Sequence, residues 1–155
     1  MVILSGGVSA GDFDFIPSVI KELDFEILVT RIAVQPGKPI IFARKGNKYC
    51  FGLAGNPASS FVQFELYLKP FLHKMMGYDL KPKIAKANLA ADFFRKKKDR
   101  LMFVPAYLNE DLTLTQIEYH GSAHINALIN ANCLMIVPIG VSEIKKGEKV
   151  DVRRF

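Results

Sequence analysis

A glycine-rich segment near the start of the chain has the residue types of an oxyanion site. It reads SGGVSAGDFD over residues 5–14, between a short apolar run and a helical pattern. Adjacent glycines can turn several backbone N–H groups to one side, and the start of the following helix adds positive potential. The segment therefore predicts that Ser5, Gly6, Gly7 and Ser9 bind an anionic group.

Two carboxylates, Asp12 and Asp14, close this segment. Carboxylate oxygens are ligands that Mg²⁺ takes in proteins, so both residues are candidate metal ligands or contacts to a metal-bound oxygen. A plain turn whose aspartates cap the helix explains the same residues equally well.

A lysine lies between two prolines in the segment Gln35-Pro36-Gly37-Lys38-Pro39. Both prolines restrict the backbone, so the ammonium of Lys38 is presented with little freedom at the entrance of a strand. This is how a fixed cation for an oxyanion can be built. An ordinary surface turn is the alternative.

A second strand-to-helix turn reads GLAGNPAS over residues 52–59. Asn56 is a good N-cap, Pro57 a good first helical residue, and Ser59 offers a hydroxyl in the first turn. The start of a helix has unpaired N–H groups, so Asn56 and Ser59 are candidate binding residues, with a plain helix start as the alternative.

The elements that must position these turns form an α/β unit. Short apolar runs predict strands at residues 2–4, 25–29, 40–43 and 49–53, and helical periodicity predicts a helix from residue 16 to 23. A long helix follows Asn56, with a predicted apolar stripe and a kink at Pro70; the stripe is Phe61, Phe64, Leu68, Leu72 and Met75. We expect the three turns at carboxyl ends of strands, hence at one edge of the sheet.

The second half of the chain has strand-like segments, after a linker at residues 80–83. Strands are predicted at residues 84–89, 101–108, 112–117, 133–138 and 149–152, with one short helical stretch at 125–129. Short strands separated by turn signals indicate a small β-barrel or sandwich. The predicted domains are therefore 1–79 and 80–155.

Composition narrows the class of protein. The chain has 155 residues and a formal net charge of +6, which suits an anionic partner. It has no apolar run long enough for a membrane span, no signal-like start, and no aromatic residues within its basic run at 95–100. We expect a cytoplasmic protein with two buried free thiols, Cys50 and Cys133, that binds a small molecule and neither a membrane nor nucleic acid.

The motif order SGGVSxGxxD, PGKP, GxxGNPxS and a closing β domain resembles the MoeA/gephyrin E-domain family of molybdopterin molybdenumtransferases. The resemblance covers nearly the whole chain and implies the end of a molybdopterin-binding-type α/β domain followed by a C-terminal β-barrel. It implies molybdenum cofactor biosynthesis: binding of molybdate and adenylylated molybdopterin, and insertion of molybdenum into the dithiolene with the help of Mg²⁺.

Residue by residue, the resemblance places metal or molybdate handling at Asp14 and the adjacent acidic position Asp12. Lys38 and Pro39 fall on its molybdate-binding lysine–proline, and Ser59 falls on the serine of GNPxS. Asp14 and Lys38 are thus the catalytic candidates.

In the β domain, residues 99–103 resemble the family's R-x-x-F strand start, so Arg100 is implied to face an oxyanion. Residues 120–124 resemble its GSxH segment, which makes Ser122 a candidate ligand with His124 beside it. Three positions depart from the pattern: Gln35 replaces a frequent lysine, Ala54 the proline of GLPGNP, and Pro105 a frequent basic residue.

The resemblance leaves two other functions open. One is a non-catalytic molybdopterin-binding or scaffold module of the same fold. The other is a pterin adenylyltransferase, against which PGKP and the β domain argue. It also implies a homodimer and further N-terminal domains, so we expect the strand at 2–4 to be an open edge that self-associates or pairs with an absent segment.

Overall fold

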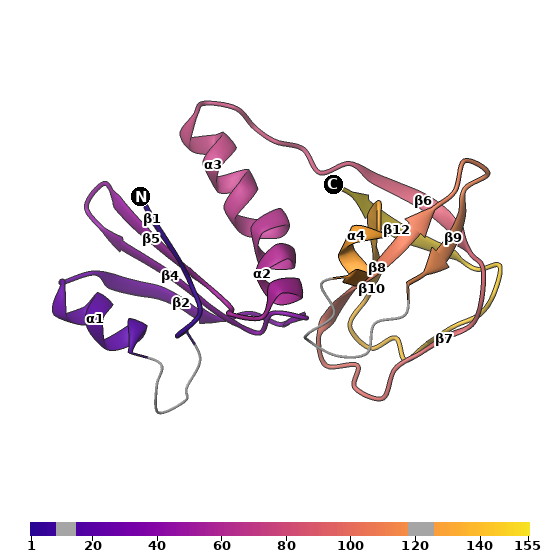
Figure 1. Cartoon of the computed structure of the whole chain (residues 1–155), viewed down its shortest axis with the longest axis horizontal. Helices are drawn as coiled ribbons and strands as arrows, with labels where there is room; N and C mark the ends of the chain where they lie inside the picture. The colour runs from indigo at the N-terminus through magenta and orange to yellow at the C-terminus, as the bar shows by residue number, and fades with distance from the viewer. Residues whose placement is uncertain (9–14, 118–125) are drawn as a thin grey trace. The chain divides into compact units, whose positions relative to one another are not determined.

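The computed structural model describes residues 1–8, 15–117 and 126–155 (Figure 1). The chain divides into two compact units, residues 1–32 with 36–79 and residues 33–35 with 80–155. Residues 33–35 pack in the second unit because Val34 and Gln35 form a strand there, although they precede residue 80. Two domains at residues 1–79 and 80–155 remain our proposal, except that residues 33–35 pack with the second unit.

The first unit is built on a four-stranded sheet in the order β1-β5-β4-β2 (Figure 1). Its strands are β1 (Val2–Ser5), β2 (Glu26–Arg31), β4 (Pro39–Lys45) and β5 (Lys48–Leu53). β1 runs parallel to β5, whereas β5 with β4 and β4 with β2 are antiparallel.

Side chains alternate across this sheet and form two cores. Ile41, Ala43 and Cys50 pack with Val8 and with Ile20 of α1 (Ile16–Glu22) on one face. The other face carries Ile40, Phe51 and Leu53, which pack with Leu68 of the long helix; Phe71 there contacts the rings of Phe42, Tyr49 and Phe51 at centroid distances of 5.5, 5.1 and 5.1 Å. The period of two thus buries the central strands β4 and β5 on both faces, whereas β1 and β2 are exposed or half-buried.

The long helix is interrupted by a π turn. It consists of α2 (Pro57–Gln63), η1 (Phe64–Leu68) and α3 (Lys69–Met75). The Lys69 N–H donates to the carbonyl of Phe64, five residues back, directly before Pro70, which has no N–H to donate. The predicted stripe is therefore wrong in part: Phe64 and Met75 are exposed.

β1 is an edge strand, and the apolar face beside it is open. Val2 and Ile3 are about half exposed, as are Val19 and Leu23 on α1. An apolar cavity of about 370 Å³ lies between β1 and α1, lined by Val2, Leu4, Phe15, Ile16, Val19, Ile20, Leu23, Phe25 and Cys50. That a second copy of the chain or an absent segment covers this face stays a prediction.

The second unit contains a closed barrel. Five strands follow one another in the order β10-β12-β6-β9-β8, and β8 pairs back to β10 to close the ring. They are β6 (Ile84–Leu89), β8 (Leu101–Leu108), β9 (Thr113–Gln116), β10 (Cys133–Val137) and β12 (Lys149–Arg154). The predicted α/β unit followed by a small β-barrel is confirmed.

Shorter elements complete this unit. β3 (Val34–Gln35) adds to β8, β7 (Phe93–Phe94) pairs with β11 (Glu143–Ile144), and α4 spans Asn126–Ile129. The interior is apolar throughout, with Leu89, Leu114 and Met135 among its fully buried side chains. Within the described residues of the whole chain, no helix is long and apolar enough to cross a membrane.

Candidate functional site

Two of the predicted turns are joined through their backbones. Because β1 and β5 are parallel, the loop after Ser5 and the turn after Leu53 leave the sheet side by side, and the Gly6 N–H donates to the carbonyl of Leu53 over 3.0 Å. Gly6 and Gly7 have φ of 88° and 66°, in the left-handed region that glycine adopts at no cost. Ser5, Gly6 and Gly7 therefore lie at the edge predicted for them.

The third turn reaches the same edge in a different way. Lys38 precedes β4, so PGKP lies at the amino end of its strand and not at a carboxyl end as predicted. β4 is antiparallel to β5, with Ile41 opposite Gly52, and its start therefore lies beside the end of β5. The three turns do come together. The reason is that β4 runs antiparallel to β5, and not that all three turns follow the ends of parallel strands.

A buried glutamine connects two of these turns. Gln63 on α2 is fully buried, and its Nε2 donates to the carbonyls of Gly37 at 2.9 Å and Pro39 at 2.6 Å. Its Oε1 accepts a hydrogen bond of 2.8 Å from the N–H of Ala54. Gln63 is not predictable from the sequence, because a single glutamine inside a helical pattern carries no signal of its partners.

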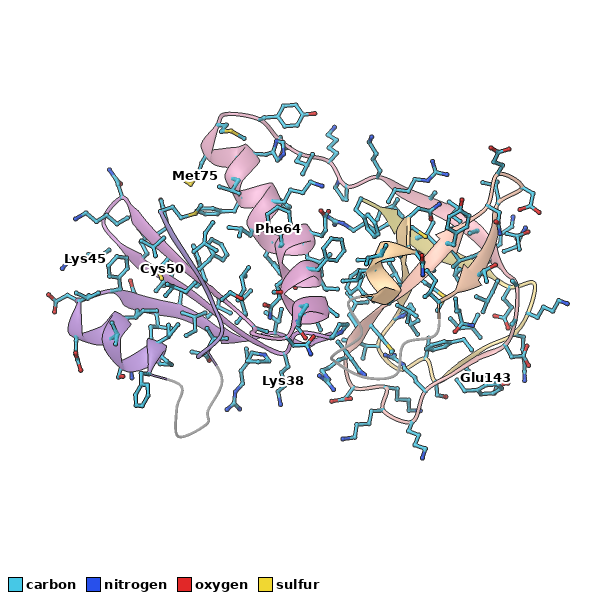
Figure 2. All side chains as sticks on the ribbon, viewed as in Figure 1. Lys38, Lys45, Cys50, Phe64, Met75 and Glu143 are labelled. Atoms are coloured by element: carbon cyan, nitrogen blue, oxygen red, sulfur yellow. The ribbon has the colours of Figure 1, made fainter. Side chains whose placement is uncertain are left out.

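A cavity of about 520 Å³ opens beside Lys38. Among the described residues it is lined by Val8, Pro17, Thr30, Arg31, Lys38, Pro39 and Ile41. It thus has two cationic side chains, one hydroxyl and, within the described part of the chain, no carboxylate. Figure 2 shows Lys38 at the end of the sheet where α2 begins, far along β4 from Lys45.

The cations of this cavity are accessible. Lys38 and Arg31 are both exposed, and neither forms an ion pair with any residue that the structure describes. Arg31 ends β2 and lies opposite Pro39, which begins β4. The sequence did not predict Thr30 and Arg31 as site residues, because their place beside PGKP depends on the pairing of β2 with β4.

Asn56 and Ser59 have structural tasks at the start of α2. Asn56 Oδ1 accepts from the N–H of Ser59 at 3.1 Å, as an N-cap does. Ser59 is buried, and its carbonyl oxygen would lie 3.2 Å from a β-carbon at Gly37. Ser59 is thus beside the PGKP turn, and a binding role for Asn56 and Ser59 remains a prediction.

Four predicted site residues lie outside the described residues: Ser9, Asp12, Asp14 and Ser122. His124 lies outside them as well. The described residues contain no cluster of three His, Cys, Asp or Glu side chains that could hold a metal ion. Mg²⁺ at Asp12 and Asp14 therefore stays a prediction.

Arg100 belongs to the second unit, at the start of β8. It is partly buried, and its Nε lies 3.7 Å from Asp99 Oδ2. Arg95, in the same basic run, donates to the backbone carbonyls of Arg100, Pro138 and Val141, so it fixes the surrounding loops. Arg95 is therefore structural, whereas an oxyanion contact for Arg100 stays a prediction.

The two cysteines are free and buried, as predicted. Burial raises the pKa of the Cys50 thiol, and it raises the pKa of Cys133 to about 11. The Cys133 thiol donates to the carbonyl of Ala106 at 3.3 Å. Neither sulfur is suited to act as a nucleophile at neutral pH.

Comparison with known proteins matches the two units to two families. Residues 1–74 match the probable molybdopterin binding domain, and residues 86–155 match the MoeA C-terminal region, domain IV. A molybdopterin molybdenumtransferase from Staphylococcus epidermidis is 37% identical over 98% of the chain, and one from Staphylococcus aureus is 36% identical over the same share. The chain belongs to the MoeA family.

Solved structures agree with this assignment. A molybdopterin biosynthesis MoeA protein from Pyrococcus horikoshii superposes over 99% of the chain with a TM-score of 0.80 and 32% identity. A molybdenum cofactor biosynthesis protein from Pyrococcus furiosus, at 22% identity and a TM-score of 0.75, shares the fold. The chain spans 37% of the length of the curated MoeA relatives and of the first of these two structures.

Proposed function

We propose that this chain provides the molybdate-binding part of a molybdopterin molybdenumtransferase, in the biosynthesis of the molybdenum cofactor. The observation that carries the proposal is the cavity of about 520 Å³ in which Lys38 and Arg31 meet Thr30. Family membership supports the reaction class, since the curated relatives are named for it.

The cavity suits a tetrahedral dianion such as molybdate. An ammonium and a guanidinium give charge-assisted hydrogen bonds to oxyanions, and the threonine hydroxyl can donate one more. Pro39 and the buried Gly37 hold the backbone around Lys38, so little conformational freedom is lost on binding. The formal net charge of +6 favours the approach of an anion.

The neighbouring loop after β1 is proposed to bind the adenylylated molybdopterin. Gly6 and Gly7 give the backbone the left-handed turn that exposes N–H groups, and Ser5 and Ser9 add hydroxyls. Asp14 is the proposed carboxylate for the transfer, with Asp12 beside it. As the resemblance implies, the dithiolene sulfurs of the pterin are proposed to receive the molybdenum; both protein thiols are buried and have no part in it.

Further groups are proposed from the resemblance alone. Asn56 and Ser59 at the start of α2 are proposed binding residues, and Arg100 and Ser122 of the second unit are proposed oxyanion contacts. A homodimer, which the resemblance implies, or an additional segment is proposed to complete the site, and the curated relatives are longer than this chain. A scaffold module without turnover is the competing function.

Calorimetric titration of molybdate into the full chain tests the proposal. Lys38→Ala should weaken binding in a salt-dependent manner, whereas Lys48→Ala, an exposed lysine on the β4–β5 hairpin, should not. Equal affinity in wild type and Lys38→Ala would refute the molybdate site. Binding without molybdenum transfer to adenylylated molybdopterin, in the presence of the remaining part of the family fold, would favour the scaffold function.

A further inference from the structure

Gln63 holds both peptide carbonyls that flank Lys38. Its side-chain nitrogen donates to Gly37 O at 2.9 Å and to Pro39 O at 2.6 Å, so one carboxamide fixes the backbone immediately before and after the lysine. The side chain is fully buried, and all of this lies within the first unit.

The orientation of this carboxamide is forced by its partners. The nitrogen has two N–H donors and faces two carbonyl oxygens, while the oxygen faces the N–H of Ala54 at 2.8 Å. A flipped amide would place its oxygen against two carbonyls and its nitrogen against a donor. Because buried polar groups are costly when unpaired, the three hydrogen bonds form one arrangement that is kept or lost together.

The PGKP turn is folded directly onto this side chain. Gly37 has a φ of 106°, and a β-carbon there would lie 3.2 Å from Gln63 Cγ, from Gln63 Nε2 and from Ser59 O. The turn therefore requires glycine both for its backbone conformation and for space. Its distance from α2 is set by Gln63.

Ala54 supplies the donor that Gln63 requires. A proline at this position, as in GLPGNP, has no N–H and would leave Gln63 Oε1 buried without this donor. Alanine in place of proline at position 54 and glutamine at position 63 are thus physically coupled, because the N–H of Ala54 supplies the donor that Gln63 Oε1 accepts from.

We propose that Gln63 is a positioning residue that sets the place of Lys38 relative to the turn after β5, with Ala54 as its partner. The inference rests on the proposed function, in which Lys38 binds molybdate. Gln63 itself is buried behind the turn and acts through the backbone of residues 37–39. Loss of its hydrogen bonds should let the lysine move away from the cavity while the sheet remains folded.

The first test needs no ligand and no variant. In wild type, NMR should show slow hydrogen exchange of the Gln63 side-chain amide and rigid Gly37 and Lys38 backbone amides. The exposed side-chain amide of Asn47 provides the comparison for fast exchange. A Gln63 amide that exchanges as fast as that of Asn47 would overturn the proposal.

The second test uses variants with a matched control. Gln63→Met should lower the order parameters of Gly37 and Lys38 and weaken molybdate binding by about tenfold. Val62→Ala, at the neighbouring buried position of α2, should lower the melting temperature yet leave both properties unchanged. Equal effects of the two variants on affinity would reduce Gln63 to a general stabilising residue.

A third variant removes only one of the three hydrogen bonds. Ala54→Pro should loosen the same amides as Gln63→Met but less, and it keeps the test decisive if Gln63→Met does not fold. In the Gln63→Met background, Ala54→Pro should cause little further loosening, since its partner is already absent. Fully additive effects would contradict the coupling.

Different results would refute molybdate binding by Lys38 and the positioning of Lys38 by Gln63. If Lys38→Ala leaves molybdate affinity unchanged, the proposed function fails while the amide dynamics still decide the role of Gln63. If Lys38→Ala weakens binding, Gln63→Met should add nothing in the Lys38→Ala background. An undiminished effect of Gln63→Met there would show that Gln63 acts by a route other than Lys38.

Discussion

Val8 lies so close over Gly52 that a β-carbon at position 52 would be 2.7 Å from Val8 Cγ1. This contact seats the loop after β1 on the strand β5, and Val8 also lines the cavity beside Lys38. A side chain at Gly52 must therefore push the loop outward or distort the strand.

Gly52→Ala should consequently destabilise the chain by about 1–3 kcal/mol through overpacking. Val8→Ala removes the clashing methyl groups, so the double variant should lose less than the sum of the two single changes. Denaturant unfolding of the four proteins measures the cycle. Additive losses would mean that the two residues do not meet as described.

Arg31→Ala should weaken molybdate binding by about 1.5 kcal/mol at low salt, because it removes a charge-assisted hydrogen bond. The loss should shrink as ionic strength rises, since Arg31 is exposed. Arg44→Ala, an exposed arginine at the far end of the same sheet, provides the control. Titration calorimetry at two salt concentrations measures the molybdate affinity of both variants. An equal loss of affinity in Arg44→Ala would indicate a general charge effect.

The stability of the chain should decline between about pH 9 and pH 11 because of Cys133. Burial raises the pKa of this thiol from 9.0 to about 11, so the folded state binds the proton more tightly than the unfolded state. The stabilisation is fully present below pH 9 and is lost as the pH rises through the folded value. The free energies of unfolding of wild type and Cys133→Ala should converge as the pH rises, and unfolding curves at about pH 8, about pH 10 and about pH 11 measure this.

Ile3→Lys should reduce self-association of the isolated chain. Ile3 is 47% exposed on the edge strand β1, whose open side presents unpaired backbone groups, and a lysine on an edge strand opposes pairing with another chain. Tyr107→Lys, with 48% exposure on a strand paired on both sides, is the matched control. Light scattering that shows a monodisperse monomer for wild type would contradict the expectation.

Periodicity predicted most of the strands because each is several residues long and apolar on a regular spacing. The predicted ranges 84–89 and 101–108 coincide with β6 and β8. Strands of two residues, such as β3 and β7, have no period to detect. For β3 the consequence is larger, since it takes residues 33–35 into the second unit.

The candidate site was predictable where a motif carries its own local geometry. Gly6 and Gly7 adopt the left-handed backbone that their type allows, and Lys38 is presented at a strand entrance. Arg31 and Gln63 were not predictable, because their importance comes from residues distant in sequence: Pro39 across the sheet for Arg31, and the carbonyl of Gly37 for Gln63.

The π turn at residues 64–68 has a consequence for chain length. An α-helix advances by about 100° per residue, and a π turn absorbs one residue more than an α turn without changing the direction in which later side chains point. Phe71 thereby keeps its rotational phase toward Phe42 and Phe51. Deleting the exposed Tyr67 would leave a continuous α-helix with Phe71 still facing the sheet, whereas inserting a residue there would turn the ring away from it. This helix therefore tolerates being one residue shorter better than one residue longer.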